Sequence, residues 1–571
     1  MMSKSETQPS SGKLSQLVRS IFPIAEWLPK YQISFLRWDL IAGLTLAFFV
    51  MPESLAYAVL AGVPPQYGVY CCLAGGFFFA LFSTSRQVAV GPTSAISLMI
   101  GTSVAVIAGG DMQRCIAIAG LVAFVIGILC IIAYILKLNS IVNFISESIL
   151  LGFKAGAALC IAATQLPKFF GVEGTSGNFF IRIHSLLQHL PETNVATLLL
   201  GVIGFALLFA GTKIFPGKPV SLFVLIASIL AITFTSLSSH GIHLTGEIPS
   251  GLPSVGRPSL RPTDVEGILG LALACFLMGY IETTSAARTF AQKNNYQVDT
   301  RQELLSLGFA NLASAFASGY AVAGGLSQST VNDKAGAKTP LALITCSITL
   351  AGLLFFTGLL TNLPEVILGA IVLDAILGLI KVKELKQLYN ISKLEFAIAM
   401  TAFAGVLLLG ILKGVMIAAV ASIVLLLRRT SNPHVAIIGK VPGTNLYSDI
   451  DRHSNNEVFN NLLILRVESS FFYFNVENIY KTIWKYINST NGHVQMLIIN
   501  MTSSAYVDVA GTKMLLHLSK ELADKKIKLR IVEARSGVRD LLRKQGMEEH
   551  VGPISRHISC NDVVEEFLAG R

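Results

Sequence analysis

The chain has 571 residues, of which 53% are hydrophobic and only 14% are charged, and its mean hydropathy is +0.62. A soluble domain carries about a quarter charged residues, so this composition excludes an ordinary soluble protein and indicates a membrane protein with a smaller polar part. The net charge of +10 does not call for a nucleic acid partner, because basic cytoplasmic loops of a membrane protein account for it.

Residues 1–38 precede the first apolar span and are basic. Because positive charge favours the cytoplasmic side of a membrane, we expect a cytoplasmic N-terminus and a location in the cell inner (plasma) membrane. No short apolar stretch with a small-residue cleavage site precedes Asp39, so we expect no removed signal peptide. The basic residues of this segment are Lys4, Lys13, Arg19, Lys30 and Arg37.

Residues 39–429 are predicted to form an all-α transmembrane domain of many spans. A helix needs about 20 apolar residues to cross the hydrocarbon of a bilayer. Residues 171–192 and the proline-rich residues 238–265 are expected to be extramembrane loops. Arg428 and Arg429 fit an exit on the cytoplasmic side. The fourteen predicted spans, of which the third and tenth are short, are 40–60, 67–83, 93–108, 115–136, 145–165, 194–213, 219–237, 266–288, 302–318, 326–337, 340–360, 363–380, 394–411 and 413–428.

Residues 430–571 differ in character and are predicted to be a linker followed by a small cytoplasmic α/β domain. Short apolar or alternating runs indicate strands at 462–467, 494–500 and 527–532. Helical patterns occupy 476–486, 511–523 and 538–545. Strands that alternate with helices are typical of an α/β domain, and about 130 residues are enough for such a domain to fold alone.

Two of the predicted helices begin inside apolar sequence rather than at a surface. Gly91-Pro92 precedes the short third span, and Gly324-Gly325 precedes the short tenth span. Glu53 and Glu282 also lie at matching places, in the first and eighth spans. These matched positions predict two halves of seven helices each, and because seven is odd the second half is inverted in the membrane.

In such an inverted repeat, the N-termini of the two short helices face each other at mid-membrane. Each offers unpaired N–H groups and about half a positive charge, a combination that binds anions. Ser94, Ser327 and Ser329 can add hydroxyl donors. The alternative interpretation is that the Gly and Pro residues only kink helices so that they pack.

Several ionisable or polar side chains lie inside the spans. Glu53 and Glu282 can bind a proton that accompanies the anion, or can be neutral groups that tie helices together. Lys154 can reach out to the membrane surface, or can face the interior and pair with a Glu or with the substrate. Tyr57, one turn after Glu53 on the same helix face, can form a wall of the site. Asp374 is a weaker candidate and is interpreted as structural.

Four stretches of the chain resemble the sulfate permease (SulP) family of anion transporters, whose members carry a C-terminal STAS domain. The resemblance covers nearly the whole chain after the N-terminal segment. In the small domain, Val507-Asp508-Val509-Ala510-Gly511 resembles a STAS loop. The matching stretches of the membrane domain are Pro52-Glu53-Ser54-Leu55-Ala56-Tyr57-Ala58 with Val63-Pro64-Pro65-Gln66-Tyr67-Gly68-Val69-Tyr70, then Thr84-Ser85-Arg86-Gln87-Val88-Ala89-Val90-Gly91-Pro92, and Gly325-Leu326-Ser327-Gln328-Ser329-Thr330-Val331-Asn332.

The resemblance implies fourteen helices in two inverted repeats, arranged as a core domain that moves against a gate domain, and it implies a homodimer. It places the anion between the third and tenth helices and makes Glu282 the acid of the eighth helix. Together with the positions of these residues inside apolar spans, the resemblance predicts that Glu282 and Glu53 couple a proton to anion transport. Lys154 is a possible charge partner. The predicted substrate-binding residues are Glu53, Tyr57, Thr93, Ser94, Ser327 and Gln328.

Two positions depart from the family pattern. Many members have Arg where this chain has Gln328, so the site lacks a fixed positive charge and the case for a divalent anion is weaker. Related loops of anti-sigma antagonists carry a phosphorylatable Ser, but Val509 and Ala510 have no hydroxyl, which leaves Thr512 as the nearby candidate. The STAS domain is therefore interpreted as a regulatory or assembly module.

The function expected from the sequence is secondary active transport of an inorganic anion, with sulfate:proton symport as the first choice. The alternatives are a bicarbonate or dicarboxylate transporter, with sodium as a possible coupling ion, and a passive anion channel. The sequence holds no recognisable nucleophile–base pair, metal-spaced His cluster or phosphate loop, so we expect neither an enzyme nor a cofactor or metal site. The expected partners are the anion, a proton, the lipid bilayer and a second copy of the chain.

Overall fold

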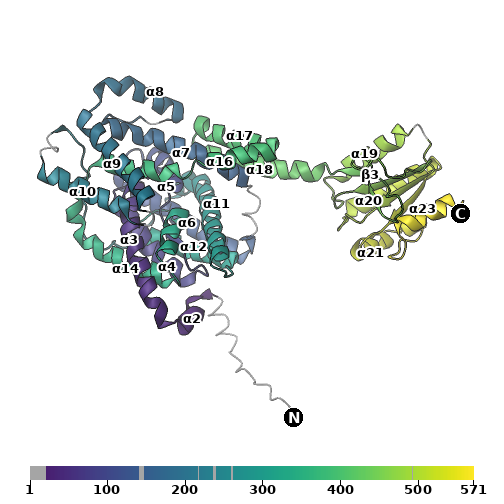
Figure 1. Ribbon diagram of the computed structural model, residues 1–571, viewed down its shortest axis with the longest axis horizontal. Helices are drawn as coiled ribbons and strands as arrows, with labels where there is room; N and C mark the ends of the chain where they lie inside the picture. The colour runs from purple at the N-terminus through teal and green to yellow at the C-terminus, as the bar shows by residue number, and fades with distance from the viewer. Residues whose placement is uncertain are drawn as a thin grey trace, which may run out of the picture. The chain divides into compact units, whose positions relative to one another are not determined.

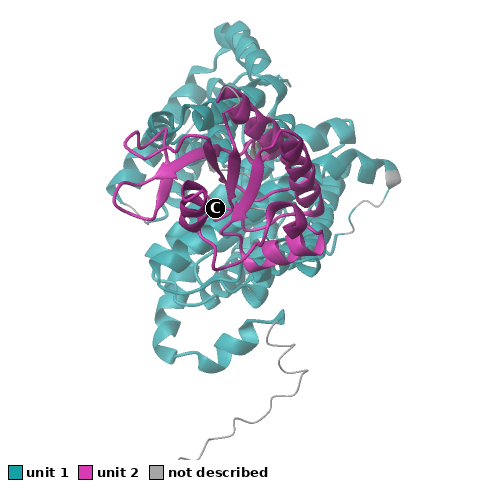
Figure 2. Ribbon diagram, turned by 90° about the vertical axis from the view of Figure 1, so that its right-hand side faces the viewer, with its two compact units in different colours: residues 1–422 teal, residues 423–571 magenta. Residues whose placement is uncertain are grey.

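The computed structural model describes residues 21–139, 147–175, 177–215, 218–235, 240–256, 258, 261–490 and 493–570. The chain divides into two compact units, residues 1–422 and residues 423–571, shown in teal and magenta in Figure 2. Unit 1 is helical apart from two short strands, and unit 2 combines helices with a five-stranded sheet. Because each unit has its own hydrophobic cluster, each is described by itself.

A helix lies at each of the predicted spans within the described residues (Figure 1). Among the described residues, six helices are long and apolar enough to cross a membrane by length and composition. The count of fourteen membrane spans stays a prediction. The helices at these spans are α3 (Ile33–Leu60), α4 (Gln66–Phe82), α5 (Ser94–Ala108), α6 (Met112–Ile135), α7 (Glu147–Phe170), α9 (Val195–Ile214), α10 (Val220–Phe234), α11 (Pro262–Lys293), α12 (Thr300–Phe316), α13 (Leu326–Lys334), α14 (Leu341–Leu353), α15 (Glu365–Leu377), α17 (Lys393–Leu409) and α18 (Ile411–Ser431), the last continuing into unit 2.

Short helices occupy segments where the sequence predicted loops or no element. Helix α8 (Phe179–His189) lies inside the expected loop 171–192, and Asn178 caps it by accepting a hydrogen bond from the N–H of Ile181 at 3.0 Å. Helix α16 (Val382–Ile391) precedes α17. Both are amphipathic and too short to span a bilayer, which is why a search for long apolar runs misses them. The remaining short pieces of unit 1 are α2 (Ile24–Trp27), η1 (Leu28–Lys30), η3 (Leu190–Glu192) and η5 (Leu354–Leu360).

Two three-residue strands join the halves of unit 1. Strand β1 (Ala89–Gly91) pairs with β2 (Ala323–Gly325) in antiparallel register, Ala89 opposite Gly325 and Gly91 opposite Ala323. Each strand leads almost directly into a short helix, β1 into α5 and β2 into α13. A side chain at Gly324 would meet the Cα of Thr283 at 2.9 Å, so glycine lets this strand lie directly against α11.

The helix packing repeats between the two halves. Helix α3 packs on α14, and its counterpart in the second half, α11, packs on α6. In the same way, α4 packs on α14 and its counterpart α12 packs on α6. Likewise α7 packs on α17 as α9 packs on α15. These pairs divide unit 1 into a core group (α3–α6 and α11–α14) and a gate group (α7, α9, α10, α15, α17 and the membrane part of α18). The arrangement is the inverted repeat with core and gate that the sequence predicts.

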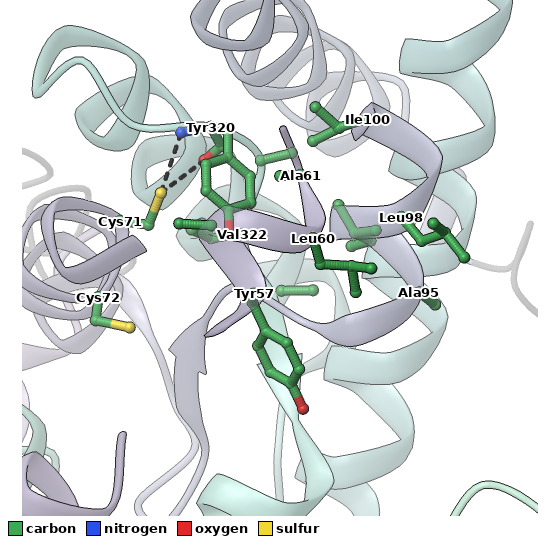
Figure 3. Packing of buried hydrophobic residues seen from close by; sticks show 14 of the residues in the cluster. Tyr57, Leu60, Ala61, Cys71, Cys72, Ala95, Leu98, Ile100, Tyr320 and Val322 are labelled. Atoms are coloured by element: carbon green, nitrogen blue, oxygen red, sulfur yellow. Dashed lines mark hydrogen bonds between the residues drawn. The ribbon is translucent and has the colours of Figure 1, made fainter. Parts of the chain in front are cut away.

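The core group is closely packed around the two strands. A side chain at Gly68 would meet the carbonyl oxygen of Ser54, so α4 lies directly against α3. Cys71 of α4 accepts a hydrogen bond from the N–H of Tyr320 at 3.0 Å and donates one to its carbonyl at 3.5 Å. Figure 3 shows this contact beside buried Tyr57, Leu98 and Val322. The thiol thereby holds the segment that enters β2.

Unit 2 is built on a mixed sheet in the order β4-β3-β5-β6-β7. The strands are β3 (Val435–Lys440), β4 (Tyr447–Asp449), β5 (Leu462–Val467), β6 (Met496–Asn500) and β7 (Lys528–Val532), and the last three are parallel. The three predicted strands are confirmed within two residues at each end; β3 and β4 were missed. The helices are α19 (Val476–Ser489), α20 (Val509–Asp524), α21 (Ser536–Lys544), α22 (Glu548–Val551) and α23 (Cys560–Leu568).

The STAS-like loop ends in the N-cap of α20. Asp508 caps this helix by accepting from the N–H of Gly511 at 2.8 Å, and it also accepts from the N–H of Tyr473 at 2.7 Å. Thr512 is fully buried, and its hydroxyl donates to the carbonyl of Val509 at 2.9 Å. Phosphorylation of Thr512 would therefore require this helix start to open.

We expect residues 435–571 expressed alone to be soluble and to show a mixed α/β circular dichroism spectrum. Leu465→Ala should lower the free energy of unfolding by about 2–5 kcal/mol, because Leu465 is fully buried in the central strand β5. Lys528→Ala, at an exposed position of β7, is the control and should stay within about 0.5 kcal/mol of the parent. A fragment that is unfolded under mild conditions would contradict this boundary.

Candidate anion site

Two helices of the core group begin inside the apolar part of unit 1. Helix α5 begins at Ser94 after the extended residue Thr93, and α13 begins at Leu326 after the extended residue Gly325. Neither helix has a side-chain cap. The N–H groups of a first helical turn have no partners within their own helix and carry partial positive charge. The two helix starts therefore form a place that attracts an anion.

The two helix starts are adjacent. Gln328, in the first turn of α13, donates a hydrogen bond from Nε2 to the carbonyl oxygen of Pro92 at 3.4 Å. Pro92 stands directly before Thr93, the N-cap of α5. A side chain at Gly91 would meet Gln328 Oε1 at 3.2 Å, so the backbone before α5 approaches this amide closely. The β1–β2 pairing thus brings both positive helix ends to one place.

Glu53 of α3 reaches the first turn of α13. Its Oε1 accepts from the hydroxyl of Tyr57 at 2.9 Å and from that of Ser327 at 3.5 Å. Its Oε2 accepts from Gln328 Nε2 at 3.1 Å. Glu53 is buried, whereas Ser327 is exposed to open space. Four of the predicted site residues therefore form one hydrogen-bonded cluster with an accessible edge.

Polar atoms without partners gather at the same place. Thr93 lies close enough to Glu282 of α11 for their side chains to interact. Within the described residues, Thr93 Oγ1, Glu282 Oε2 and Gln328 Oε1 are buried and have no hydrogen-bond partner. Buried polar atoms are nearly always paired, because an unpaired one costs about 1–3 kcal/mol. Two of these atoms lie at the helix starts and the third lies on α11, and their lack of partners makes this place a candidate binding site.

The gate group contributes two charged residues to this neighbourhood. Lys154 of α7 is half-buried, and its charge acts on Glu282. Asp374 of α15 is also half-buried, and its charge acts on Glu53. The influence of Lys154 on Glu282 favours the inward-facing interpretation over the one in which Lys154 reaches the membrane surface. Glu53 and Glu282 therefore each lie within electrostatic range of a charged residue of the gate group.

Ser329 differs from the sequence-based expectation that it donates to the anion. Its hydroxyl donates to the carbonyl of Gly325 at 2.6 Å and accepts from the N–H of Ala89 at 3.0 Å. Ser329 is fully buried and binds α13 to β1. Its hydroxyl proton is used within the helix because a serine one turn into a helix can donate to the carbonyl four residues earlier.

Sequence reasoning missed the supporting roles of two residues. Thr283 accepts a hydrogen bond from the N–H of Gly324 at 2.8 Å. Asn332 donates to the carbonyl of Gln87 at 3.0 Å, and this links α13 to the segment before β1. The sequence signal that could have revealed these residues was a polar residue close to each predicted site element. In the part of the chain that the structure describes, no three His, Cys, Asp or Glu residues gather to hold a metal ion.

The fold defines a class of protein, a multi-pass membrane transporter, and the candidate anion site lies between its two broken helices. The chain belongs to the sulfate permease family, whose model matches residues 36–402. A STAS domain model matches residues 453–559. The protein is therefore an anion transporter of the sulfate permease family with a C-terminal STAS domain.

Relatives and solved structures of similar kind cover nearly the whole chain. A probable sulfate transporter of Mycobacterium tuberculosis is 30% identical over 550 residues, covering 95% of this chain and 98% of the relative. The chloroplastic sulfate transporter 4.1 of Arabidopsis thaliana is 29% identical, covering 97% of this chain and 84% of the relative. The murine Solute Carrier 26 family member A9 anion transporter, in its inward-facing state, shares the fold with a TM-score of 0.89 at 21% identity, covering 99% and 97% of the two chains.

A second structural neighbour covers only unit 1. The transmembrane domain of a cyanobacterial bicarbonate transporter matches 69% of this chain and 98% of its own length, with a TM-score of 0.60 at 21% identity. At this identity the likeness establishes the fold alone. The likeness therefore does not identify the substrate of this chain.

We expect Ser327→Ala to weaken the apparent affinity for sulfate roughly twofold to tenfold, because it removes one neutral hydrogen bond worth about 0.5–1.5 kcal/mol. Ser327→Trp should abolish transport by filling the space between the two helix starts. Ser285→Ala, at an exposed serine of α11, is the control and should leave transport unchanged. Uptake of labelled sulfate into proteoliposomes measures all three variants. Normal transport by a folded Ser327→Trp protein would show that the anion binds elsewhere.

Proposed function

We propose that the chain is a secondary active transporter that imports sulfate together with a proton. Support for sulfate comes from full-length relatives at about 30% identity that carry the name sulfate transporter. Support for an anion site comes from the two uncapped helix starts of α5 and α13. Support for a proton comes from two acids, Glu53 and Glu282, at the same place.

The observation that carries the proposed coupling is the hydrogen bonding of Glu53. An ionised Glu53 accepts from Ser327 and Gln328, and these are side chains that an anion at α13 would also use. Its negative charge would also repel the anion at a distance where little water screens it. A proton on Glu53 removes the charge and weakens both hydrogen bonds. Binding of the anion and binding of the proton therefore favour each other at this site.

Glu282 offers a second place for a proton, on the α5 side. Lys154 is its cationic neighbour, and Thr93 lies beside it. An ionised Glu282 holds the charge of Lys154, whereas a protonated Glu282 leaves that charge for the anion. This exchange supplies the positive potential that an arginine supplies in relatives and that Gln328 lacks. We therefore assign proton coupling to Glu282 together with Glu53.

Bicarbonate is the second candidate substrate, and a particular atom favours it. Gln328 Oε1 is buried and lacks a hydrogen-bond partner within the described residues. Bicarbonate has a hydroxyl that can donate to this oxygen, whereas sulfate has no hydrogen to donate. A neutral Gln328 also fits a monovalent anion better than a divalent one. A dicarboxylate, a sodium-coupled mechanism and a passive channel are the remaining alternatives.

The same proposal includes topology and assembly. We propose that both termini lie in the cytoplasm and that the protein is in the inner membrane; Arg428 and Arg429 at the end of α18 and the basic residues before α3 support this orientation. We divide the chain functionally into a cytoplasmic segment (1–38), a transport domain (39–429) and a linker with the STAS domain (430–571). We propose a homodimer on the family resemblance.

We expect Glu282→Gln to keep the fold and lose accumulation of sulfate driven by a pH gradient, because glutamine mimics the protonated acid. Exchange of anion for anion should persist, because it needs no net proton movement. Glu266→Gln, at an exposed acid of the same helix α11, is the control and should accumulate sulfate like the parent. Proteoliposomes with imposed proton or sodium gradients and competing bicarbonate, dicarboxylate and sulfate give the measurement.

Each outcome of that experiment bears on one part of the proposal. If accumulation follows only a sodium gradient, sodium and not the proton is the coupling ion. Uptake that never exceeds equilibrium under either gradient would indicate a channel. Stronger competition by bicarbonate than by unlabelled sulfate would make bicarbonate the substrate. Unchanged proton-driven accumulation by the Glu282→Gln protein would make Glu282 structural.

We expect Lys154→Gln to reduce sulfate uptake strongly, and Gln328→Arg added to it to restore part of the loss. The physical reason is that the anion needs one nearby positive charge besides the helix ends. Lys213→Gln, at an exposed lysine of α9, is the control for loss of a charge. Parent-like uptake by Lys154→Gln at equal expression would show that the helix ends alone hold the anion.

A further inference from the structure

A second cavity lies where the chain enters the first membrane helix. Its volume is about 390 Å³. The walls come from α2 and η1, from the loop between α4 and β1, and from the loop between α13 and α14. None of its lining residues belongs to the anion site described above. The proposed transport mechanism gives this cavity no role.

The cavity is surrounded by positive charge. Lys30, Arg86 and Lys338 line it, and the one acid among its lining residues is Glu26. Glu26 is already 3.7 Å from Lys30. The guanidinium carbon of Arg86 lies 4.9 Å over the ring of Tyr296, which is a cation–π contact rather than an ion pair. The lining therefore has a net positive charge and exposed cationic heads.

Two carboxylates behind the wall are already satisfied by donors. Asp39 accepts from the N–H groups of Lys338 and Thr339 at 2.7 and 3.0 Å and from two hydroxyls. Glu303 accepts from the hydroxyl and N–H of Thr84 at 2.7 and 2.9 Å and from its neighbours Ser83 and Ser85. These acids hold the two loops in place. Their lone pairs are used there, and the cations of the cavity stay available.

One residue that lines the cavity carries a buried donor without a partner in the described residues. The indole Nε1 of Trp27 has no hydrogen-bond partner within the described residues, although the atom is buried. A buried donor without a partner is costly, so an occupant with an acceptor oxygen would stabilise this wall. Three cations and one N–H donor together match the oxygens of a phosphate group.

The rim of the cavity is apolar and exposed. Leu28 of η1 is 53% exposed, and Ile33 and Trp38 at the start of α3 are 84% and 48% exposed. Helix α3 is long and apolar enough to cross a membrane, so its start lies at the level of the lipid headgroups. Trp27 and Tyr31 at the same level are residue types enriched at membrane interfaces. Acyl chains can therefore lie against the rim while a headgroup enters the cavity.

We propose that this cavity binds the phosphate headgroup of an anionic phospholipid. Lys30, Arg86 and Lys338 surround the phosphate, and Trp27 Nε1 donates to one of its oxygens. Basic pockets beside membrane helices on the cytoplasmic side are suited to such headgroups. The bound lipid joins α2 and η1 to the loops that lead into β1 and α14.

The test uses the full-length protein in detergent with Trp38→Phe and Trp484→Phe, which leaves Trp27 as the only one of the three tryptophans. Quenching of Trp27 fluorescence is measured with dibrominated phosphatidylglycerol and with dibrominated phosphatidylcholine in mixed micelles. We expect phosphatidylglycerol to quench at a mole fraction at least about tenfold lower, because each cation near a headgroup favours the anionic lipid by roughly fivefold and the cavity has three cations. Equal quenching by the two lipids would overturn the proposal.

Two charge variants and a soluble competitor complete the test. Arg86→Gln with Lys338→Gln should remove the preference for phosphatidylglycerol. Lys383→Gln with Lys386→Gln, at exposed lysines of α16, loses the same charge and should keep the preference. Loss of preference in both double variants would indicate only general attraction to charge and would contradict the site. Relief of quenching by micromolar glycerol 3-phosphate would show that the ligand is a soluble phosphate and not a lipid.

Discussion

The pairing of β1 with β2 is the interaction on which the rest of unit 1 depends. Backbone groups inside a bilayer need partners, and non-helical backbone is tolerated there only where it is enclosed by protein or lines a cavity. The short antiparallel ladder meets this need for the two segments that interrupt the apolar sequence. It also leaves the first turns of α5 and α13 side by side, with Glu53 and Gln328 between them. The proposed anion site is therefore a consequence of how these backbone segments satisfy their hydrogen bonds.

The membrane helices and the broken pair could be predicted, because long apolar runs and Gly or Pro interruptions are local features. Glu53 with Tyr57 also follows from spacing on one helix face. The hydrogen bond between Glu53 and Gln328 joins residues 275 positions apart, and only the folded chain reveals it. Strands of three residues carry no periodic pattern, so β1, β2 and β4 are invisible to sequence reasoning. The role of Ser329 was misread because its hydroxyl is used inside its own helix.

The positive potential at the site has two sources that belong to different groups of helices. The helix ends of α5 and α13 are fixed parts of the core group, whereas Lys154 belongs to α7 of the gate group. In family members with Arg at the position of Gln328, the arginine and the helix ends would both belong to the core group. In this chain, a movement between the groups would change the distance from Lys154 to the anion. The positive potential at the proposed anion site would therefore depend on the conformation of the transporter.

The hydrogen bonds of Ser329 and Thr283 affect how the core group moves. They tie β1, β2, α11 and α13 into one body, so the donors that face the anion keep their arrangement when that body moves. A carrier of this kind presents nearly the same binding surface to either side of the membrane, apart from Lys154 and Asp374. Such a carrier has no built-in direction. The direction of its flux would be set by the sum of the electrochemical gradients of the anion and of any coupled ion, and reversing that sum would reverse transport.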